Sequence, residues 1–261
     1  MSSPSENGGD GRVVVDRRNS VACILIDRAE KANSLSPVLF ERLSDAIAEA
    51  EADPEVRVIV IRGAGERAFC GGFELGRTED KLVHPMKRAR RNLHELILEV
   101  EKPTIAAING AAVGAGCEIA LACDLRVAAT GAKLGQTEAR VGMGGNFGAV
   151  LLPRLLPKAI ALELLFTGRL FTAEEGLAWG LLNRVVPISE LDSEVAALAE
   201  AIAANAPLSV RKMKVTAMKG EGLPLAAALR LNVGPDPYSS EDRLEGARAF
   251  KEKRPPRFRG V

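Results

Sequence analysis

The stretch NGAAVGAGCE, which runs from Asn109 to Glu118, places three closely spaced glycines just before a glutamate. Such glycines let the backbone approach a ligand closely, and the first N–H groups of a helix have no acceptor within that helix. The loop can therefore donate hydrogen bonds to a phosphate group, or to an oxygen that becomes negatively charged during a reaction. The rest of the sequence must decide between these two uses.

The phosphate alternative is the glycine loop of a dinucleotide-binding domain, whose spacing this stretch matches. That loop opens a dinucleotide domain, whereas Gly110 lies in the middle of the chain. Short-chain dehydrogenases also need a Tyr-x-x-x-Lys pair, but the only tyrosine, Tyr238, is followed four positions later by Asp242. No acidic residue ends a second strand between Arg126 and Lys133. We therefore exclude dinucleotide binding.

Other catalytic signatures are missing from the sequence. It contains neither a G-x-S-x-G nucleophile turn nor a G-x-x-x-x-G-K-[ST] phosphate loop. His94 is followed by Glu95, but position 98 is a leucine, so the zinc-protease helix is incomplete. His84 and His94 are the only histidines, and each is expected to be a surface or packing residue of the helix near it. No metal site is predicted.

A second glycine loop and a second glutamate favour a different chemistry. The sequence AFCGGFEL, around Gly71, follows a predicted strand, and Glu138 follows another strand-like segment. One N–H group from each glycine loop, pointing at the same carbonyl oxygen, would form an oxyanion hole. A helix beginning near Gly116 would add its positive end. The pattern favours a reaction that develops charge on a carbonyl oxygen, with Glu118 and Glu138 available for proton transfer.

The composition suits a soluble globular chain, with 47% apolar and 26% charged residues among 261. A net charge of +1 gives no reason to expect a polyanionic partner. The four cysteines lack the spacing of a disulfide scaffold, so free thiols in a reducing compartment are expected. Residues 1–12 are expected to be a disordered leader, not a secretory signal, and no apolar run could span a membrane. A cytoplasmic location is expected.

The order of the predicted elements places both glycine loops after strands. Strands are expected at Val21–Arg28, Val56–Gly63 and Thr104–Asn109, and helices after the Ser36–Pro37 pair and from about Pro85 to Val100. Beyond residue 188 the pattern is helical only. The sequence therefore predicts an α/β core at residues 13–200 and a helical C-terminal region at residues 201–261.

These motifs resemble those of the crotonase superfamily, the enoyl-CoA hydratase/isomerase family. AFCGGFEL resembles the family loop A-F-x-A-G-x-D-[LI], and KPTIAAINGAAVGAGCEIALACDLRVA resembles K-P-x-I-A-A-[VI]-x-G-x-A-x-G-G-G-x-E-L-A-x-x-C-D. FTGRLFTAEEGLAWGLLNRVVP and SEDRLEGARAFKEKRPPRFRG resemble its later segments. The resemblance extends from about Val13 to Gly260. It implies a crotonase-like spiral of ββα units with a helical C-terminal oligomerisation region, assembled as a homotrimer or as a hexamer of two trimers.

The resemblance also implies the residues of an acyl-CoA site. The oxyanion donors would be the backbone N–H groups of Phe73 and Ala115. Of the catalytic pair, Glu138 would be the main acid and base, and Glu118 would position and activate water. No cofactor is implied, because the CoA thioester is the substrate. The remaining implied residues are Lys31, Ala32, Cys70, Gly71, Phe250 and Lys253 for CoA, the last two on a neighbouring subunit's CoA, and Gly145 and Asn146 for the acyl pocket.

The implied reaction is the reversible addition of water to an α,β-unsaturated acyl-CoA thioester. Within the family, a carnitinyl-CoA-type dehydratase would use both carboxylates equally, whereas Δ3,Δ2-enoyl-CoA isomerases commonly keep only one. Dehalogenases, thioester hydrolases and decarboxylases are further alternatives. The segment GGNFGAV departs from the family's usual P-G-A-G-G-T-like run, and Phe73 places a large ring beside the oxyanion loop. The acyl group therefore stays open.

A binding function is the alternative outside enzymes. Lys87, Arg88, Arg90 and Arg91 form a basic cluster, and some crotonase-like proteins carry a basic helix that binds RNA. Aromatic residues for base stacking are absent nearby, acidic residues flank the cluster, and at helical spacing the cations spread over more than one face. We therefore expect neither a nucleic-acid nor a membrane partner.

Overall fold

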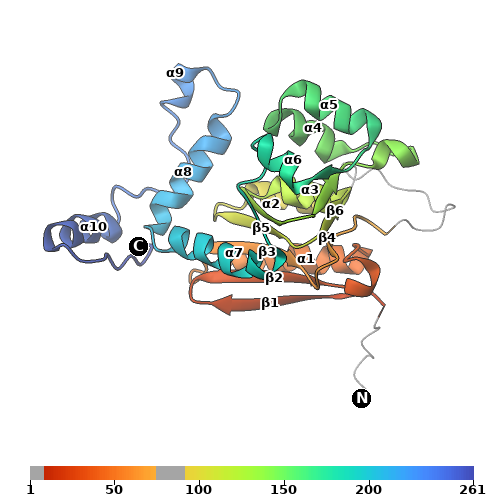
Figure 1. Cartoon of the computed structure of the whole chain (residues 1–261). Helices are drawn as coiled ribbons and strands as arrows, with labels where there is room; N and C mark the ends of the chain where they lie inside the picture. The colour runs from red at the N-terminus through yellow and green to blue at the C-terminus, as the bar shows by residue number, and fades with distance from the viewer. Residues whose placement is uncertain (1–8, 75–91) are drawn as a thin grey trace, which may run out of the picture.

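The computed structural model describes residues 9–74 and 92–261, and its strands form two sheets (Figure 1). The larger sheet contains, in spatial order, β1 (Arg12–Arg18), β2 (Val21–Asp27), β3 (Val58–Gly63), β5 (Thr104–Ile108), β7 (Leu125–Ala129) and β10 (Arg184–Val186). The smaller sheet contains β4 (Ala68–Cys70), β6 (Ala111–Val113), β8 (Lys133–Gly135) and β9 (Phe171–Thr172). The β1–β2 and β8–β9 pairs are antiparallel, and the other pairs are parallel.

From β3 to β8, successive strands alternate between the two sheets, and this alternation produces a spiral. β3, β5 and β7 lie in the larger sheet, and each is followed in the chain by a short strand of the smaller sheet, β4, β6 or β8. Because β4 pairs with β6 and β6 pairs with β8 in parallel, the loops that leave these short strands lie at the same edge. The two glycine loops and Glu138 are therefore brought to one place.

Some of the helices begin where the sequence provides a side-chain cap. Ser36 accepts the N–H of Leu39 at 3.1 Å and precedes a proline at the first helical position, as predicted. The helical segments are η1 (Ala29–Lys31), α1 (Pro37–Ala52), α2 (Leu93–Glu99), α3 (Ala115–Ala122), η3 (Glu138–Val141), α4 (Asn146–Leu155), α5 (Lys158–Thr167), α6 (Ala173–Ala178), α7 (Ile188–Ala203), α8 (Pro207–Gly220), α9 (Leu225–Ala228) and α10 (Glu241–Glu252).

The expected helix from Pro85 to Val100 is wrong at its start. Residues 85–91 lie outside the described residues, and Asn92 has an extended backbone with ψ 147°. Its side chain caps the helix, and Glu95 completes the capping box by accepting the Asn92 N–H at 2.9 Å. α2 therefore begins at Leu93, because a helix cannot continue through an extended residue.

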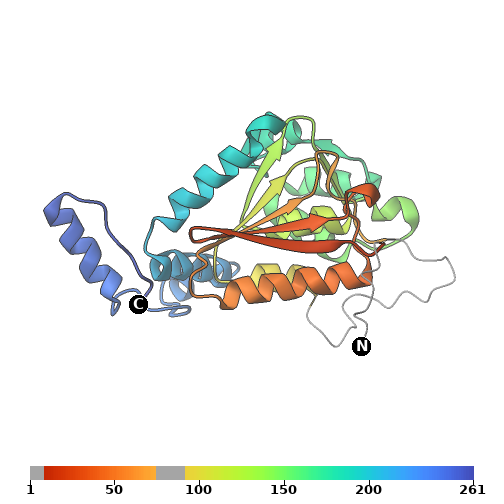
Figure 2. The same ribbon diagram turned by 90° about the horizontal axis from the view of Figure 1, so that it is seen from below.

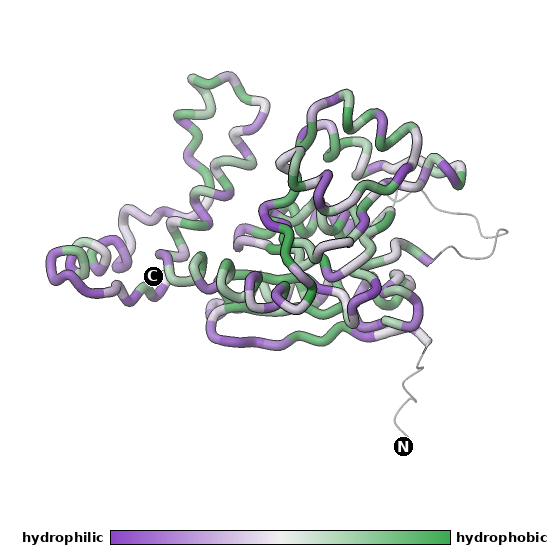
Figure 3. The backbone as a smooth tube through the Cα atoms, in the orientation of Figure 1, coloured by the Kyte–Doolittle hydropathy of each residue, from purple (hydrophilic) through white to green (hydrophobic). Residues whose placement is uncertain are grey.

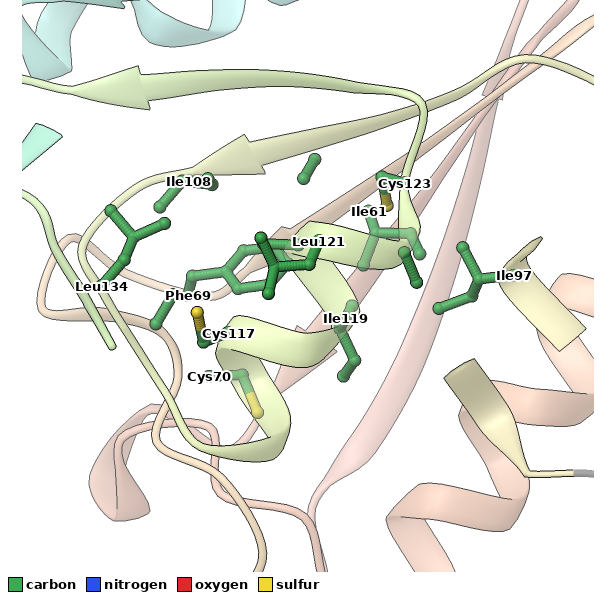
Figure 4. Close-up of a cluster of buried hydrophobic side chains, with 14 of the residues drawn as sticks. Ile61, Phe69, Cys70, Ile97, Ile108, Cys117, Ile119, Leu121, Cys123 and Leu134 are labelled. Carbon is green, nitrogen blue, oxygen red and sulfur yellow. The ribbon is translucent and has the colours of Figure 1, made fainter. Parts of the chain in front are cut away.

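The larger sheet is covered on both faces, as the apolar composition of its parallel strands requires. Ile59 and Ile61 of β3 pack in a cluster with α1, α2 and α3, whereas Val58 and Val60 pack against α7. Figure 2 shows α1 and α7 on opposite faces of this sheet. The cluster around α3 joins the two sheets, and Figure 4 shows its residues Cys117, Ile119 and Leu121 together with Phe69 and Cys70 of β4.

The last three helices, α8–α10, extend from one end of this body (Figure 1), and α8 is joined to it by Lys214, whose Nζ donates to Oδ2 of Asp124 at 2.7 Å. Apolar and polar residues are interspersed along them (Figure 3), and large apolar side chains stay exposed, among them Met213, Leu225, Leu229 and Phe250. Of the expected leader, residues 1–8 lie outside the described residues, and Arg12 already begins β1 opposite Asp27. Among the described helices, none is both long and apolar enough to cross a membrane.

Replacing Gly116 with alanine is expected to destabilise the fold, although alanine normally favours a helix. The new Cβ would lie 2.0 Å from the carbonyl oxygen of Cys70, so α3 would have to move away from β4. We expect the free energy of unfolding, measured by urea denaturation, to fall by about 1–3 kcal/mol.

Gly246→Ala is the matched control, because Gly246 is also helical and its new Cβ would only touch the Phe258 ring at 3.6 Å. This variant should be neutral or slightly more stable. If both variants lost the same stability, the close contact between α3 and β4 would not be the cause.

Candidate active site

The two glycine loops contact each other at the start of α3. Cys70 of β4 pairs with Ala112 of β6, which brings the residues that follow each strand side by side. A Cβ built on Gly72 would lie 2.9 Å from the carbonyl oxygen of Val113 and 3.7 Å from the amide nitrogen of Ala115. Gly72 also has a φ of +96°, which side chains disfavour. A glycine is therefore needed at this position on two independent grounds.

Neither expected oxyanion donor gives its N–H group to an acceptor among the described residues. Around Phe73, the N–H of Leu35 donates to the carbonyl of Gly72 at 2.8 Å, and the N–H of Glu74 donates to the carbonyl of Leu35 at 3.0 Å. Neither contact uses the N–H of Phe73. Ala115 is the first residue of α3, where N–H groups lack intrahelical acceptors. Within residues 9–74 and 92–261, no group accepts a hydrogen bond from either N–H.

Glu118 lies in the first turn of α3, as predicted, and is buried. Its Oε1 accepts the N–H of Gly148 in α4 at 2.9 Å. A Cβ on Gly148 would lie 2.3 Å from the side chain of Gln136, so only glycine lets α4 come this close. Burial raises the pKa of Glu118, although the hydrogen bonds from the α4 backbone oppose the shift.

Glu138 begins η3 and is half-buried beside the same helix start. Cβ atoms built on Gly114 and Gly145 would lie 3.2 Å from its Oε1 and 3.6 Å from its Cδ, respectively. Its Oε2 is buried and has no hydrogen-bond partner among the described residues. Burial raises the pKa of Glu138, and the nearby charge of Glu118 raises it further. The two expected catalytic carboxylates therefore share one electrostatic environment.

His94 also belongs to this cluster, which the sequence did not predict. The residue is 1% exposed, and its Nε2 lies 3.6 Å from Oε2 of Glu118. Its ring packs against Phe147 of α4, with 4.8 Å between ring centroids. Burial lowers the pKa of His94 to about 4, so the imidazole is neutral near pH 7. The one available sequence signal was the capping pattern N-x-x-E from Asn92 to Glu95, which fixes the position of His94 in the first turn.

Four of the expected CoA-binding residues lie together beside the first glycine loop. The N–H of Gly71 donates to the carbonyl of Ala32 at 2.9 Å, and Lys31 is exposed next to it. The thiol of Cys70 is fully buried, and burial raises its pKa to about 12. Cys70 can therefore face a ligand only through its backbone.

The other expected ligand residues are divided between two places. Gly145 and Asn146 lie at the start of α4, next to Glu138. Phe250 and Lys253 belong to α10 and its C-terminal cap, and the fold holds them away from the site of their own chain (Figure 1). Phe250 is 87% exposed.

Two further features of the sequence have no described counterpart at the site. The basic cluster from Lys87 to Arg91 and the second histidine, His84, lie outside the described residues. Among the described residues, no group of three or more histidine, cysteine, aspartate or glutamate side chains is arranged to hold a metal ion.

Glu118→Gln is expected to raise the free energy of unfolding near pH 7–8, because glutamine can accept the Gly148 N–H without burying a charge. The unfolded chain ionises Glu118 near pH 4.5, whereas burial raises the pKa in the folded protein. The ionisation of Glu118 therefore lowers the free energy of unfolding of the wild-type protein above about pH 4.5, by about 1.4 kcal/mol for each pKa unit of the shift.

The advantage of glutamine should shrink as the pH falls toward 4.5, and urea denaturation at several pH values would measure it. A difference that stays constant with pH would contradict the raised pKa of Glu118.

Comparison with known proteins agrees with this geometry. The family model described as enoyl-CoA hydratase/isomerase matches residues 16–261. The chain is 40% identical to (E)-benzylidenesuccinyl-CoA hydratase of Thauera aromatica, over 95% of this chain and 99% of that protein. It is 38% identical to carnitinyl-CoA dehydratase of Proteus mirabilis, over 93% of this chain and 96% of that protein.

Solved structures show the same fold. The crystal structure of enoyl-CoA hydratase from Bacillus anthracis superposes with a TM-score of 0.84 at 35% identity and covers 95% of this chain and 99% of that one. Enoyl-CoA hydratase from Mycobacterium tuberculosis gives a TM-score of 0.85 at 33% identity, with 95% and 99% coverage. These likenesses confirm the crotonase-like α/β spiral that the sequence predicts.

Proposed function

Because the chain belongs to the enoyl-CoA hydratase/isomerase family, we propose that it adds water reversibly to an α,β-unsaturated acyl-CoA thioester. The observation that carries this proposal is the placement of two carboxylates, the buried Glu118 and the half-buried Glu138, against the start of one helix. The N–H groups of Phe73 and Ala115, which have no acceptor among the described residues, lie at the same helix start. A hydration site needs this combination of proton carriers and donors.

The two N–H groups would bind the thioester oxygen. Addition of hydroxide at the β-carbon moves electrons onto this oxygen, so the charge develops where the donors and the positive end of α3 point. Backbone donors held in place need no reorganisation during the reaction, and losing one such donor typically slows a reaction by about 10²–10³. The same donors would accommodate any acyl group, because they contact only the thioester.

The two carboxylates would divide the proton transfers. Glu118, held by the Gly148 N–H, is the better placed to hold a water molecule and take its proton. Glu138, whose Oε2 has no partner among the described residues, is free to give a proton to the α-carbon and to recover it in the reverse direction. Their raised pKa values suit both duties, since each group must gain and lose a proton near neutral pH.

A dehydratase acting on a hydroxylated acyl-CoA is the second candidate. It is favoured by the 38% identity to proteins named carnitinyl-CoA dehydratase, and the same two carboxylates would serve it. The chemistry is the reverse of hydration, so the site does not distinguish them. We propose that the acyl group of the substrate determines whether hydration or dehydration is the main reaction. The segment GGNFGAV at the start of α4 would contribute to the choice of acyl group.

We further propose that the cytoplasmic protein forms a homotrimer or a hexamer. The large exposed apolar side chains of α8–α10 support this, because a second copy could cover them. Assembly would also give Phe250 and Lys253 a role, since a neighbouring subunit could place them near CoA. Size measurement in solution, by light scattering, would test the proposal directly.

Glu118→Gln and Glu138→Gln are each expected to lower kcat for hydration by about 10²–10⁴ while CoA-ester affinity survives. The amide keeps the shape of the side chain but cannot carry the proton. A panel of enoyl-CoA thioesters, including straight, branched and aryl-substituted acyl groups, would be followed by loss of enoyl absorbance and by product mass. Near wild-type turnover in either variant on a good substrate would contradict its role.

Lys253→Ala is expected to raise KM for CoA esters more than for truncated pantetheine thioesters, because the lysine would lose a phosphate partner that the truncated substrates lack. Lys251→Ala, on the same helix, is the matched control and should leave both KM values nearly unchanged. Equal effects of Lys253→Ala on the two substrate classes would show that this lysine is only a solvated residue.

A further inference from the structure

His94 is the buried titratable group that the proposed mechanism has not yet used. Among the described residues, the polar atoms that face its ring nitrogens are all oxygens: Oδ1 of Asn92 lies 2.8 Å from Nδ1, the carbonyl oxygen of Ala115 lies 3.3 Å from Nε2, and Oε2 of Glu118 lies 3.6 Å from Nε2. A neutral imidazole carries only one N–H, so one ring nitrogen must face its oxygens with a lone pair.

The capping box decides which nitrogen carries the hydrogen. Oδ1 of Asn92 accepts the backbone N–H of His94 at 3.3 Å, and the N–H of Asn92 is held by Glu95, so the amide oxygen is fixed toward the ring. A lone pair on Nδ1 would face this oxygen at 2.8 Å, which is the closest of the three contacts. The favoured tautomer therefore has the hydrogen on Nδ1 and the lone pair on Nε2.

This tautomer gives Glu118 a hydrogen-bond acceptor. Oε1 of Glu118 is already occupied by the Gly148 N–H, so a proton taken up by the carboxylate would go to Oε2, on the side of His94. A contact of 3.6 Å needs only a small movement to become a hydrogen bond, and catalytic hydrogen bonds are often long before substrate binds. The lone pair on Nε2 has no donor among the described residues.

On the basis of the proposed function, we propose that His94 is a positioning residue that accepts, at Nε2, a hydrogen bond from the proton that Glu118 takes from water. In this step an O–H bond of water breaks, the proton goes to Oε2, and the hydroxide oxygen bonds to the β-carbon. The electron pair of the carbon–carbon double bond moves toward the thioester oxygen and forms an enolate. The enolate persists until the α-carbon receives a proton. His94 stabilises the protonated carboxyl and so makes Glu118 a stronger base.

The other groups around this pair do not supply the same effect. Among the described residues, the titratable neighbours are Glu95 on α2, Cys117 on α3 and Glu138 in η3. Glu95 is engaged with the cap of α2, and burial raises the pKa of the Cys117 thiol to about 12, so this thiol stays neutral. From α4 the pair meets the Gly148 N–H and the Phe147 ring, neither of which can accept the proton.

Nitrogen NMR of the wild-type protein, with ¹⁵N-labelled histidine, tests the tautomer without any assay of activity. The chain has two histidines, so a His84→Gln variant assigns the signals. We expect His94 to show a protonated Nδ1 and an unprotonated Nε2 between pH 6 and 8. Glu118→Gln should move the Nε2 signal more than Glu138→Gln does. A protonated Nε2, or a signal that Glu118→Gln leaves in place, would overturn the proposal.

The pH profile of kcat/KM tests the effect on Glu118. His94→Gln presents an N–H donor that favours the ionised carboxylate, so the acid side of the profile should move to lower pH by about half to one unit, the effect of one hydrogen bond. Phe147→Leu is the control for packing and should leave the profile's midpoint in place. A profile that moves equally in both variants, or in neither, would contradict the proposal.

These two tests separate this proposal from the proposed function. If the wild-type protein hydrates no thioester of the panel, the proposed function fails, and the NMR signals of His94 still decide whether Nε2 accepts from Glu118. If hydration is found but Nε2 is protonated, only the role of His94 fails.

Discussion

The candidate site depends on how closely the start of α3 approaches strand β4. With no side chain at Gly116, the first turn of α3 packs directly on the carbonyl of Cys70. This contact brings the loops of Phe73 and Ala115 together, and the N–H groups of both have no acceptor in the part of the chain that the structure describes. The proposed oxyanion hole would be made of backbone, so it would not depend on which side chains stand at positions 73 and 115.

The electrostatics of the site follow from the same packing. Glu118 lies buried on α3, and Glu138 lies half-buried where the next short strand leaves the smaller sheet, so both carboxyls lose contact with water and the charge of Glu118 acts on Glu138. Such a site reduces stability, because buried charges are unfavourable without full pairing. The large apolar cluster around α3 offsets that cost and keeps the carboxyls in place. The burial of the two carboxyls and their raised pKa values therefore both result from the packing around α3.

The sequence predicted the parts of this arrangement that depend on local patterns. The buried strands followed from apolar runs, the start of α1 from Ser36 and Pro37, and the two loops from their glycines. The start of α2 was placed too early because the sequence around Asn92 was read as one continuous helix. The capping box of Asn92 and Glu95, which marks the start of α2, was not recognised. α4 was not predicted, because glycines disfavour a helix and several of them lie between positions 142 and 148. The structure needs glycine at position 148, where a Cβ atom would collide with Gln136.

His94 could not be assigned from the sequence for a different reason. One histidine on an apolar helix face has no spacing partner, and its contact with Glu118 joins α2 to α3 through tertiary packing alone. The roles of Phe250 and Lys253 could not be derived from local patterns either, because any contact of these residues with CoA would depend on a second chain. Local patterns thus indicated the two glycine loops, whereas contacts between distant elements determine how far each carboxyl is buried.

The central claim is that the N–H groups of Phe73 and Ala115 bind the thioester oxygen, and vibrational spectroscopy tests it most directly. An enoyl-CoA with a ¹³C-labelled thioester carbonyl would be bound to the Glu138→Gln variant, which should turn it over slowly enough for the spectrum of the bound substrate to be recorded. The account predicts a carbonyl stretch at lower frequency than in water, because two fixed donors at a helix start polarise the bond more than solvent does. A carbonyl stretch at the same or higher frequency than in water would contradict it.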